Sequence, residues 1–140
     1  MPLSVTVLEI FHETENWMII KTHKINDTKV AELISNDLII TSIQDGLDLL
    51  GDLYYQGFDK TIIQRKNITA DFFNLKSGIA GEILQKFANY RVRLAIVGDF
   101  SQYSGQSIND FIFESNKKGL INFVKSTSEA LNKFSAIEKI

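Results

Sequence analysis

The alternation of apolar and polar residues is most informative between Thr61 and Ser101. Residues 92–97 form a nearly continuous apolar run ended by Gly98, and residues 61–63 begin a similar, shorter run. Such β-branched runs suit strands that are covered on both faces, as in a parallel sheet. More than twenty residues separate the two runs, which is enough for a helical crossover and too many for a hairpin. The stretch therefore predicts a strand, a helix and a second strand.

The helix of this unit is predicted by apolar residues that recur every three or four positions and form a stripe that can dock on a sheet. These residues are Ile79, Ile83, Phe87 and Tyr90. Polar residues follow one border of the stripe, with Gly78, Glu82, Lys86 and Asn89 spaced by three and four. Because Glu82 precedes Lys86 by four residues, an exposed ion pair is favoured. The alternative is a polar seam that faces a cleft or a partner.

Gly78 and Gly81 lie where the helix is expected, although glycine weakens helices. We expect either a close approach of another backbone or a break near residues 76–78.

The rest of the chain adds a hairpin and more helices. The β-rich runs 18–25 and 28–34 flank Asn26-Asp27, residue types that tolerate the positive φ of a two-residue hairpin turn. Residues 42–55 predict a helix capped by Ser42, with one face made of Ile43, Leu47, Leu50 and Tyr54. Residues 38–40 are too short to assign, although an extra strand would fit there.

Three elements are expected after the central unit. A helix is predicted over residues 108–118 with Ser107 as its cap, a strand over 120–124, and a last helix capped by Ser126. Residues 1–17 are an N-terminal extension, for which we expect either an edge strand or a contact with a neighbouring molecule. The order of elements predicts one α/β domain over residues 18–140. It comprises an N-terminal β-hairpin followed by alternating helices and strands, with about four helices and a mixed sheet of about five or six strands.

Composition narrows the possible functions. The chain has 140 residues, 44% hydrophobic and 23% charged, as is ordinary for a globular domain. A net charge of −2 gives no basic field for nucleic acid or an anionic membrane, so neither is expected as a partner. The absence of cysteine excludes disulfides and thiol chemistry, and with no apolar run long enough to span a bilayer we expect a cytoplasmic protein.

Two polar loops follow the predicted central strands. In α/β sheets, sites gather beyond the carboxyl ends of parallel strands, so loops 64–71 and 98–107 are the candidates. With the polar border of the helix they give a candidate ligand or partner site of Arg65, Lys66, Asn67, Thr69, Asp71, Glu82, Lys86, Asn89, Asp99, Ser101 and Tyr103. The plain alternative is that these residues belong to ordinary connecting loops, where Thr69 and Asp71 serve as helix caps.

Known catalytic patterns are missing. Two histidines, His12 and His23, lie in the extension and the hairpin, and we expect His23 to be solvated on its strand. No histidine or thiolate spacing suggests a metal, and residues 98–107 match neither glycine-rich phosphate-loop pattern. We therefore expect no metal and no cofactor.

One long segment resembles a known family. The run FFNLKSGIAGEILQKFANYRVRLAIVGDFS, with YYQGFDK before it and FIFESNK and INFV after it, is similar to the bacterial family described as domain of unknown function forty-one eighty. The likeness spans about residues 18–135 and implies an α/β domain, similar to anti-sigma-factor antagonist (STAS-like) domains, but no activity. Members tend to carry a His-Glu pair where this chain has Gln64-Arg65, so any chemistry of that pair would be lost here. A STAS-like regulatory domain would make Thr69 or Ser101 a candidate phosphorylation site.

Two functional hypotheses follow. The first is a non-enzymatic regulatory module that binds a protein partner or small ligand and self-associates as a homodimer. The second is a small enzyme acting on an anionic metabolite at loops 64–71 and 98–107. It would use Lys66 or Lys86 to neutralise charge and Asp71 or Asp99 as acid or base. The second hypothesis requires those side chains to converge.

Overall fold

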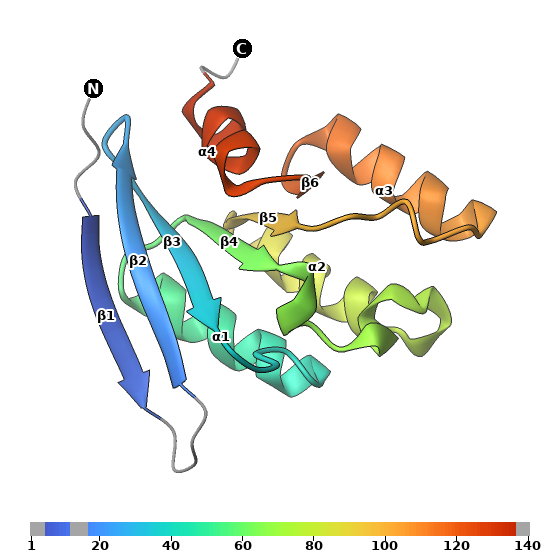
Figure 1. Cartoon of the computed structure of the whole chain (residues 1–140), viewed down its shortest axis with the longest axis horizontal. Coiled ribbons are helices and arrows are strands. Elements are labelled where there is room, and N and C mark those ends of the chain that lie inside the picture. The colour runs from blue at the N-terminus through green and yellow to red at the C-terminus, as the bar shows by residue number, and fades with distance from the viewer. Residues whose placement is uncertain (1–4, 12–16, 137–140) are drawn as a thin grey trace.

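The computed structural model describes the backbone of residues 5–11 and 17–136, and the side chains of residues 18–136. This part of the chain forms one six-stranded sheet and four α-helices (Figure 1). The strands are β1 (Val5–Phe11), β2 (Trp17–Ile25), β3 (Thr28–Ser35), β4 (Lys60–Gln64), β5 (Arg93–Val97) and β6 (Ile121–Val124). The helices are α1 (Ile43–Tyr55), α2 (Ile79–Asn89), α3 (Gln106–Lys118) and α4 (Thr127–Ser135).

The sheet is mixed, and its strands lie in the order of the sequence, from β1 at one edge to β6 at the other. Strands β1, β2 and β3 pair antiparallel, whereas β3, β4, β5 and β6 pair parallel. Each parallel pair is joined by one of the helices α1, α2 and α3. The predicted single α/β domain, parallel through its later part, is confirmed.

The β2–β3 hairpin has the turn that its sequence predicts. Asn26 and Asp27 both adopt positive φ, 50° and 65°, which a two-residue turn of this hand requires. The register places Ile25 opposite Thr28 and Met18 opposite Ser35. Asn26 also donates from Nδ2 to the carbonyl oxygen of Ser135, 3.0 Å away, which ties the hairpin to the end of α4.

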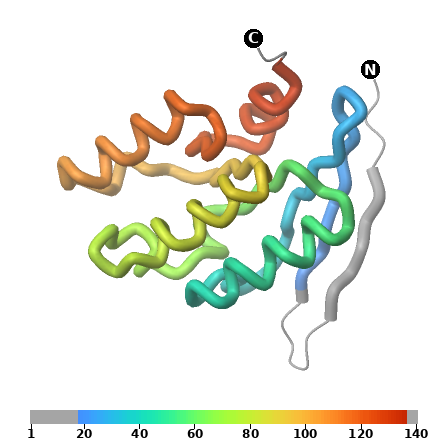
Figure 2. The backbone as a smooth tube through the Cα atoms, turned by 180° about the vertical axis from the view of Figure 1, so that it is seen from behind, coloured from blue at the N-terminus to red at the C-terminus, as the bar shows by residue number. Residues whose placement is uncertain are grey.

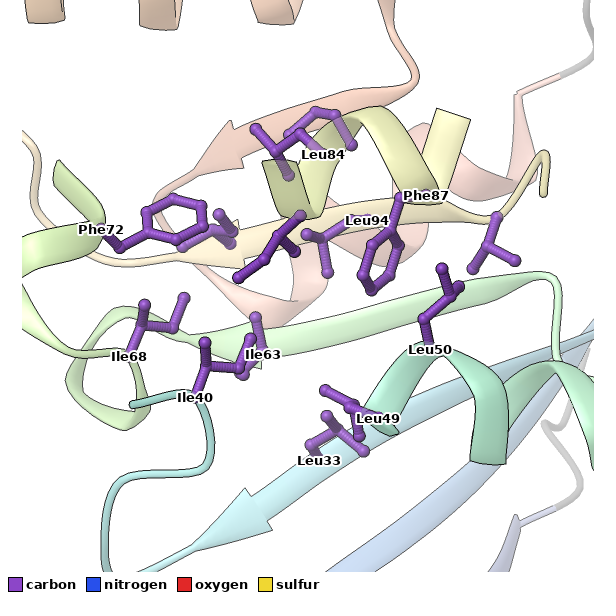
Figure 3. Close-up of a cluster of buried hydrophobic side chains, with 14 of the residues drawn as sticks. Leu33, Ile40, Leu49, Leu50, Ile63, Ile68, Phe72, Leu84, Phe87 and Leu94 are labelled. Carbon is purple, nitrogen blue, oxygen red and sulfur yellow. The ribbon is translucent and has the colours of Figure 1, made fainter. Parts of the chain in front are cut away.

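The two faces of the sheet are covered unequally. Helices α1, α2 and α3 supply the larger core, and Figure 2 shows α1 and α2 side by side on the face turned to the viewer. In Figure 3, Leu49 and Leu50 of α1 and Phe87 of α2 project into one layer with strand residues such as Leu33 and Leu94. Ala130 and Phe134 of α4 close a smaller core on the opposite face.

The buried face of α1 is rotated from the predicted one. Its buried residues are Gly46, Leu49, Leu50 and Leu53. Of the predicted face only Leu50 is buried; Tyr54 is 54% exposed. The expectation was wrong because α1 packs against α2 at Gly46 as well as against the sheet, which shifts the buried face from Leu47 and Tyr54 towards Gly46 and Leu53. The predicted cap is present, with Ser42 Oγ accepting from the N–H of Asp45 at 3.1 Å.

Other boundaries differ from expectation. The segment between β4 and α2 forms three short 3-10 turns, at Arg65–Asn67, Ala70–Phe73 and Leu75–Ser77. Helix α3 begins at Gln106 with Gly105 as its cap, two residues before the predicted start, so Ser107 is inside the helix. Residues 38–40 contribute an isolated bridge between Ile40 and Ile68 instead of a strand.

Three glycines have different roles around α1 and α2. Gly78 has φ 80° and separates the last 3-10 turn from α2, which confirms the expected break. Gly81 has open space around it, so no close approach explains it. The close approach occurs at Gly46, where a Cβ would lie 2.5 Å from Cδ1 of the fully buried Ile83. Helices α1 and α2 therefore touch at a position where no side chain fits.

His23 is not solvated as expected. Its ring is buried, and Nε2 lies 2.9 Å from Oε1 of Glu32 on the neighbouring strand. Antiparallel pairing sets Val30 opposite His23, which brings Glu32 into diagonal reach. His12 lies outside the described residues.

We predict opposite effects of alanine at two helical glycines. Gly46→Ala forces Ile83 out of its position, and overpacking of this kind costs about 1–3 kcal/mol, partly offset by the gain in helix propensity. Gly81→Ala meets no neighbour, so removing glycine from a helix stabilises the protein by about 0.5–1 kcal/mol. The free energy of unfolding from urea titrations measures both.

Ile83→Val is the control for the first change. It should recover part of the loss in the Gly46→Ala background, since it shortens the side chain that is displaced. Equal stabilisation by both alanines would contradict the close contact between α1 and α2.

Candidate functional site

The two predicted loops meet where β4 and β5 end. Gln64 and Val97 pair at the ends of these strands, so Arg65 and Gly98 follow side by side. A Cβ at position 98 would lie 2.6 Å from Cβ of Arg65. Gly98 thus allows the two loops to lie in close contact, and both loops lie at one sheet edge, as the topology predicts.

Arg65 is held within an aromatic cluster, here called the Arg65 cluster: Arg65, Phe73, Phe100 and Tyr103. The guanidinium carbon lies 4.6 Å from the ring centre of Phe73 and 5.7 Å from that of Tyr103. Nε donates to the hydroxyl of Tyr103, and Nη1 donates to the carbonyl oxygen of Ile68 at 3.4 Å. Phe73 and Tyr103 stack at 5.1 Å. Tyr103 is half-buried, and the guanidinium of Arg65 is engaged by contacts within the chain.

Asn67 ties a third segment to this edge. Its side chain is buried, and Nδ2 donates to the carbonyl oxygens of Ser35 and Asp37 at 3.2 and 2.7 Å. The backbone carbonyl oxygen of Asn67 accepts from the N–H groups of Ile39 and Ile40. Asn67 therefore holds residues 35–40 against the end of β4, and its burial keeps its side chain from the surface.

The remaining loop residues do not converge on one another. Thr69 caps the second 3-10 turn by accepting from the N–H of Asp71 at 3.4 Å. Lys66 and the Asp71 carboxylate are exposed, and within the described residues neither side chain makes an ion pair or hydrogen bond.

Asp99 and Ser101 form a closed turn. The Asp99 carboxylate accepts from Ser101 Oγ at 2.6 Å and from Ser101 N–H at 3.0 Å. The side-chain hydrogen bond is the main reason that the pKa of Asp99 is lowered; the backbone bond and the charge of Lys125 add to it. A phosphate on Ser101 would lie against this carboxylate, so like-charge repulsion opposes modification there.

The polar residues of α2 lie apart from that edge. Glu82, Lys86 and Asn89 are exposed on the helix. The expected ion pair between Glu82 and Lys86 is absent, since the described residues form ion pairs only at His23–Glu32 and Lys60–Asp59. Asn89 accepts from Gln85 at 3.1 Å. Long exposed side chains lose rotamer freedom when they pair, which explains why favourable spacing alone did not form the bond.

Lys86 instead lines a shallow cavity between α1 and α2. The cavity has a volume of about 170 Å³ and is lined by Leu47, Leu50, Gly51, Lys86 and Tyr90. Tyr90 meets Tyr54 edge to face, with ring centres 5.1 Å apart. Tyr54, Tyr55 and Tyr90 are 54%, 92% and 47% exposed. Together Leu47, Gly51, Tyr54, Tyr55, Lys86 and Tyr90 are called the α1–α2 surface below.

Sequence reasoning found Lys86 but missed the cavity. The signal available was Gly51, a glycine in the middle of a predicted helix with Tyr54 and Tyr55 one turn later. Its meaning depends on α2 lying beside α1, which the sequence pattern does not give.

Among the described residues, no three histidine, aspartate or glutamate side chains gather in a way that could hold a metal ion. None of the helices in this part of the chain is both long and apolar enough to cross a bilayer.

A sequence model of one family, described as "Domain of unknown function (DUF4180)", matches residues 25–134. The chain belongs to this uncharacterised family, as its resemblance indicated. No curated protein and no solved structure matches the chain. The likeness to STAS domains stays a prediction.

We predict that Ser101→Ala raises the pKa of Asp99 towards the ordinary range of aspartate. The variant removes the side-chain hydrogen bond and keeps the backbone one, so the pKa should return only part of the way to the ordinary value of aspartate. A carboxyl group with a lowered folded-state pKa stabilises the protein above its unfolded-state pKa, and that contribution is lost as pH falls through the folded-state value. NMR titration of the Asp99 carboxyl carbon measures the change.

Ser104→Ala is the matched control because Ser104 is exposed in the same loop. An Asp99 titration that is unaltered in Ser101→Ala would show that the turn does not hold the carboxylate in solution.

Proposed function

We propose that this chain is a non-enzymatic binding module that contacts a protein partner through the α1–α2 surface. The observation that carries the proposal is a cavity lined by Leu47, Leu50, Gly51, Lys86 and the exposed Tyr90. The exposed ring of Tyr54 contacts Tyr90, and Tyr55, which follows Tyr54 on α1, is also exposed. Tyrosine is enriched at the centres of protein interfaces because it supplies a large apolar area with a polar tip.

The size of the cavity favours a protein over a small molecule. Pockets for metabolites and drug-sized ligands usually measure roughly 300–1,000 Å³. The cavity between α1 and α2 has about 170 Å³. A space of this size suits one side chain projecting from a partner, with the surrounding tyrosines supplying the rest of the contact.

The contacts at the C-terminal edge of β4 and β5 give less support to a small enzyme. Such an enzyme would need Lys66 or Lys86 near Asp71 or Asp99, and no contact between described side chains joins either lysine to either carboxylate. Arg65 is bonded to Tyr103 and Ile68, and Asp99 to Ser101. Each strong polar group of the Arg65 cluster and the neighbouring turn already has an internal partner, which suits a structural role.

Photo-cross-linking in cells tests the proposal. A photoreactive phenylalanine analogue at position 90 should give a covalent adduct with a partner protein, because Tyr90 lies at the wall of the cavity. The matched control is the same analogue at Phe113, which is 65% exposed on α3 and lies outside the α1–α2 surface. Adducts at neither position, or in equal amounts at both, would count against the α1–α2 surface as the binding site.

A further inference from the structure

We infer that two side chains, Asn116 of α3 and Glu129 of α4, close the outer edge of β6 against the addition of another strand. Within the described residues β6 is the last strand of the sheet and pairs only with β5. The outward-facing backbone of residues 121–125 is called the β6 edge below. The inference concerns a different part of the chain from the α1–α2 surface, so it does not rest on the proposed function.

The sequence of β6 makes its edge a hazard. Residues 120–124 read LINFV, an apolar run with high β-propensity that contains no charge and no proline. Short segments of this kind readily pair with one another. Strand β6 is buried on both faces, so another strand could approach it only along the β6 edge. Folded proteins usually protect such an edge, because its outward backbone groups can pair with any extended chain.

The hydrogen bonds of β6 identify the groups that face outward. The carbonyl oxygen of Val124 accepts from the N–H of Gly98, which follows β5, at 2.9 Å, so Val124 faces β5. The direction of the backbone groups alternates along a strand. Phe123 and Lys125, on either side of Val124, therefore turn their N–H groups to the β6 edge.

Both of these outward N–H groups are bonded within the chain. Phe123 N–H donates to Oδ1 of Asn116 at 2.7 Å, and Lys125 N–H donates to Oε1 of Glu129 at 3.0 Å. An added strand would have to place its own carbonyl oxygen about 2.9 Å from the Phe123 nitrogen. Asn116 Oδ1 already lies there. Since β6 has four residues, the two bonds leave it one further outward N–H, that of Ile121.

Positive charges flank the same edge. Lys117 and Lys118 are exposed at the end of α3, and Lys125 is exposed directly after β6. Lysines beside an apolar strand oppose its pairing with a second copy, because like charges would then meet. The bonded N–H groups and the flanking charges act in the same direction. The β6 edge is therefore closed both to a second copy and to a partner that would extend the sheet there.

Hydrogen exchange and sedimentation velocity of the full chain test the inference together. Asn116→Ala removes the acceptor, so exchange of the Phe123 N–H should become about fivefold faster, the factor expected for one typical hydrogen bond. The variant should also gain a concentration-dependent associated form beyond any that the wild type shows. In that form the Phe123 N–H should again be protected, since a neighbouring strand accepts it. Asn116→Asp keeps an acceptor oxygen and should behave as the wild type.

Ser42→Ala is the matched control for lost stability. It removes one hydrogen bond at the start of α1, away from β6, and should leave association unchanged. Glu129→Ala releases the N–H of Lys125, so the double variant with Asn116→Ala should associate more strongly than either single variant. Far-UV circular dichroism checks that each variant folds, and Glu129→Ala keeps the test available if Asn116→Ala does not.

Three results would overturn the inference. They are unaltered exchange of the Phe123 N–H in Asn116→Ala, a folded double variant that associates no more than the wild type, and equal association of Ser42→Ala and Asn116→Ala. The last of these would trace association to lost stability instead of an opened edge. The presence or absence of a Tyr90 adduct bears on the proposed function alone.

Discussion

The contact between Gly46 and Ile83 is the constraint on which the α1–α2 surface depends. Because Gly46 has no side chain, the two helices approach closely enough that Ile83 is fully buried against it. The same helices leave open space five residues later, at Gly51, where a cavity forms instead of a contact. Tight packing at one end of the helix pair and a gap at the other follow from two glycines with opposite surroundings. A well-packed core beneath the gap keeps its shape, as a binding surface requires.

The C-terminal edge of β4 and β5, where α/β proteins often place their sites, is used differently in this chain. Arg65 is enclosed by aromatic rings, and Asn67 joins residues 35–40 to the end of β4. Gly98 lets the backbone of the second loop lie close to Arg65 of the first. These interactions fix the loops against one another and engage Arg65 and Asp99 within the chain. This edge of the sheet has the position of many known active sites. The hydrogen bonds of its residues nevertheless favour a structural role.

Local signals in the sequence predicted most of the fold. The Asn26-Asp27 turn, the Ser42 cap and the apolar strands were correct because each depends on neighbours in the chain. The errors concern contacts between distant segments: the rotation of α1, the burial of His23 against Glu32, and the 3-10 turns before α2. The candidate site also divides into parts set by local sequence and parts set by contacts between distant segments. Its loops were located by the strands that precede them, whereas the cavity depends on how α1 meets α2, which no local pattern contains.

The central claim is that the α1–α2 surface is the one covered in the working protein. Hydroxyl-radical footprinting, with the chain in its native cellular setting and as a dilute purified protein, tests it most directly. Tyr55 is 92% exposed in the single chain and should be strongly labelled there. We expect Tyr55 and Tyr90 to become protected in the cell while Phe113 stays reactive. Continued labelling of Tyr55 together with protection of residues 98–105 would contradict it and return the site to the C-terminal edge of the sheet.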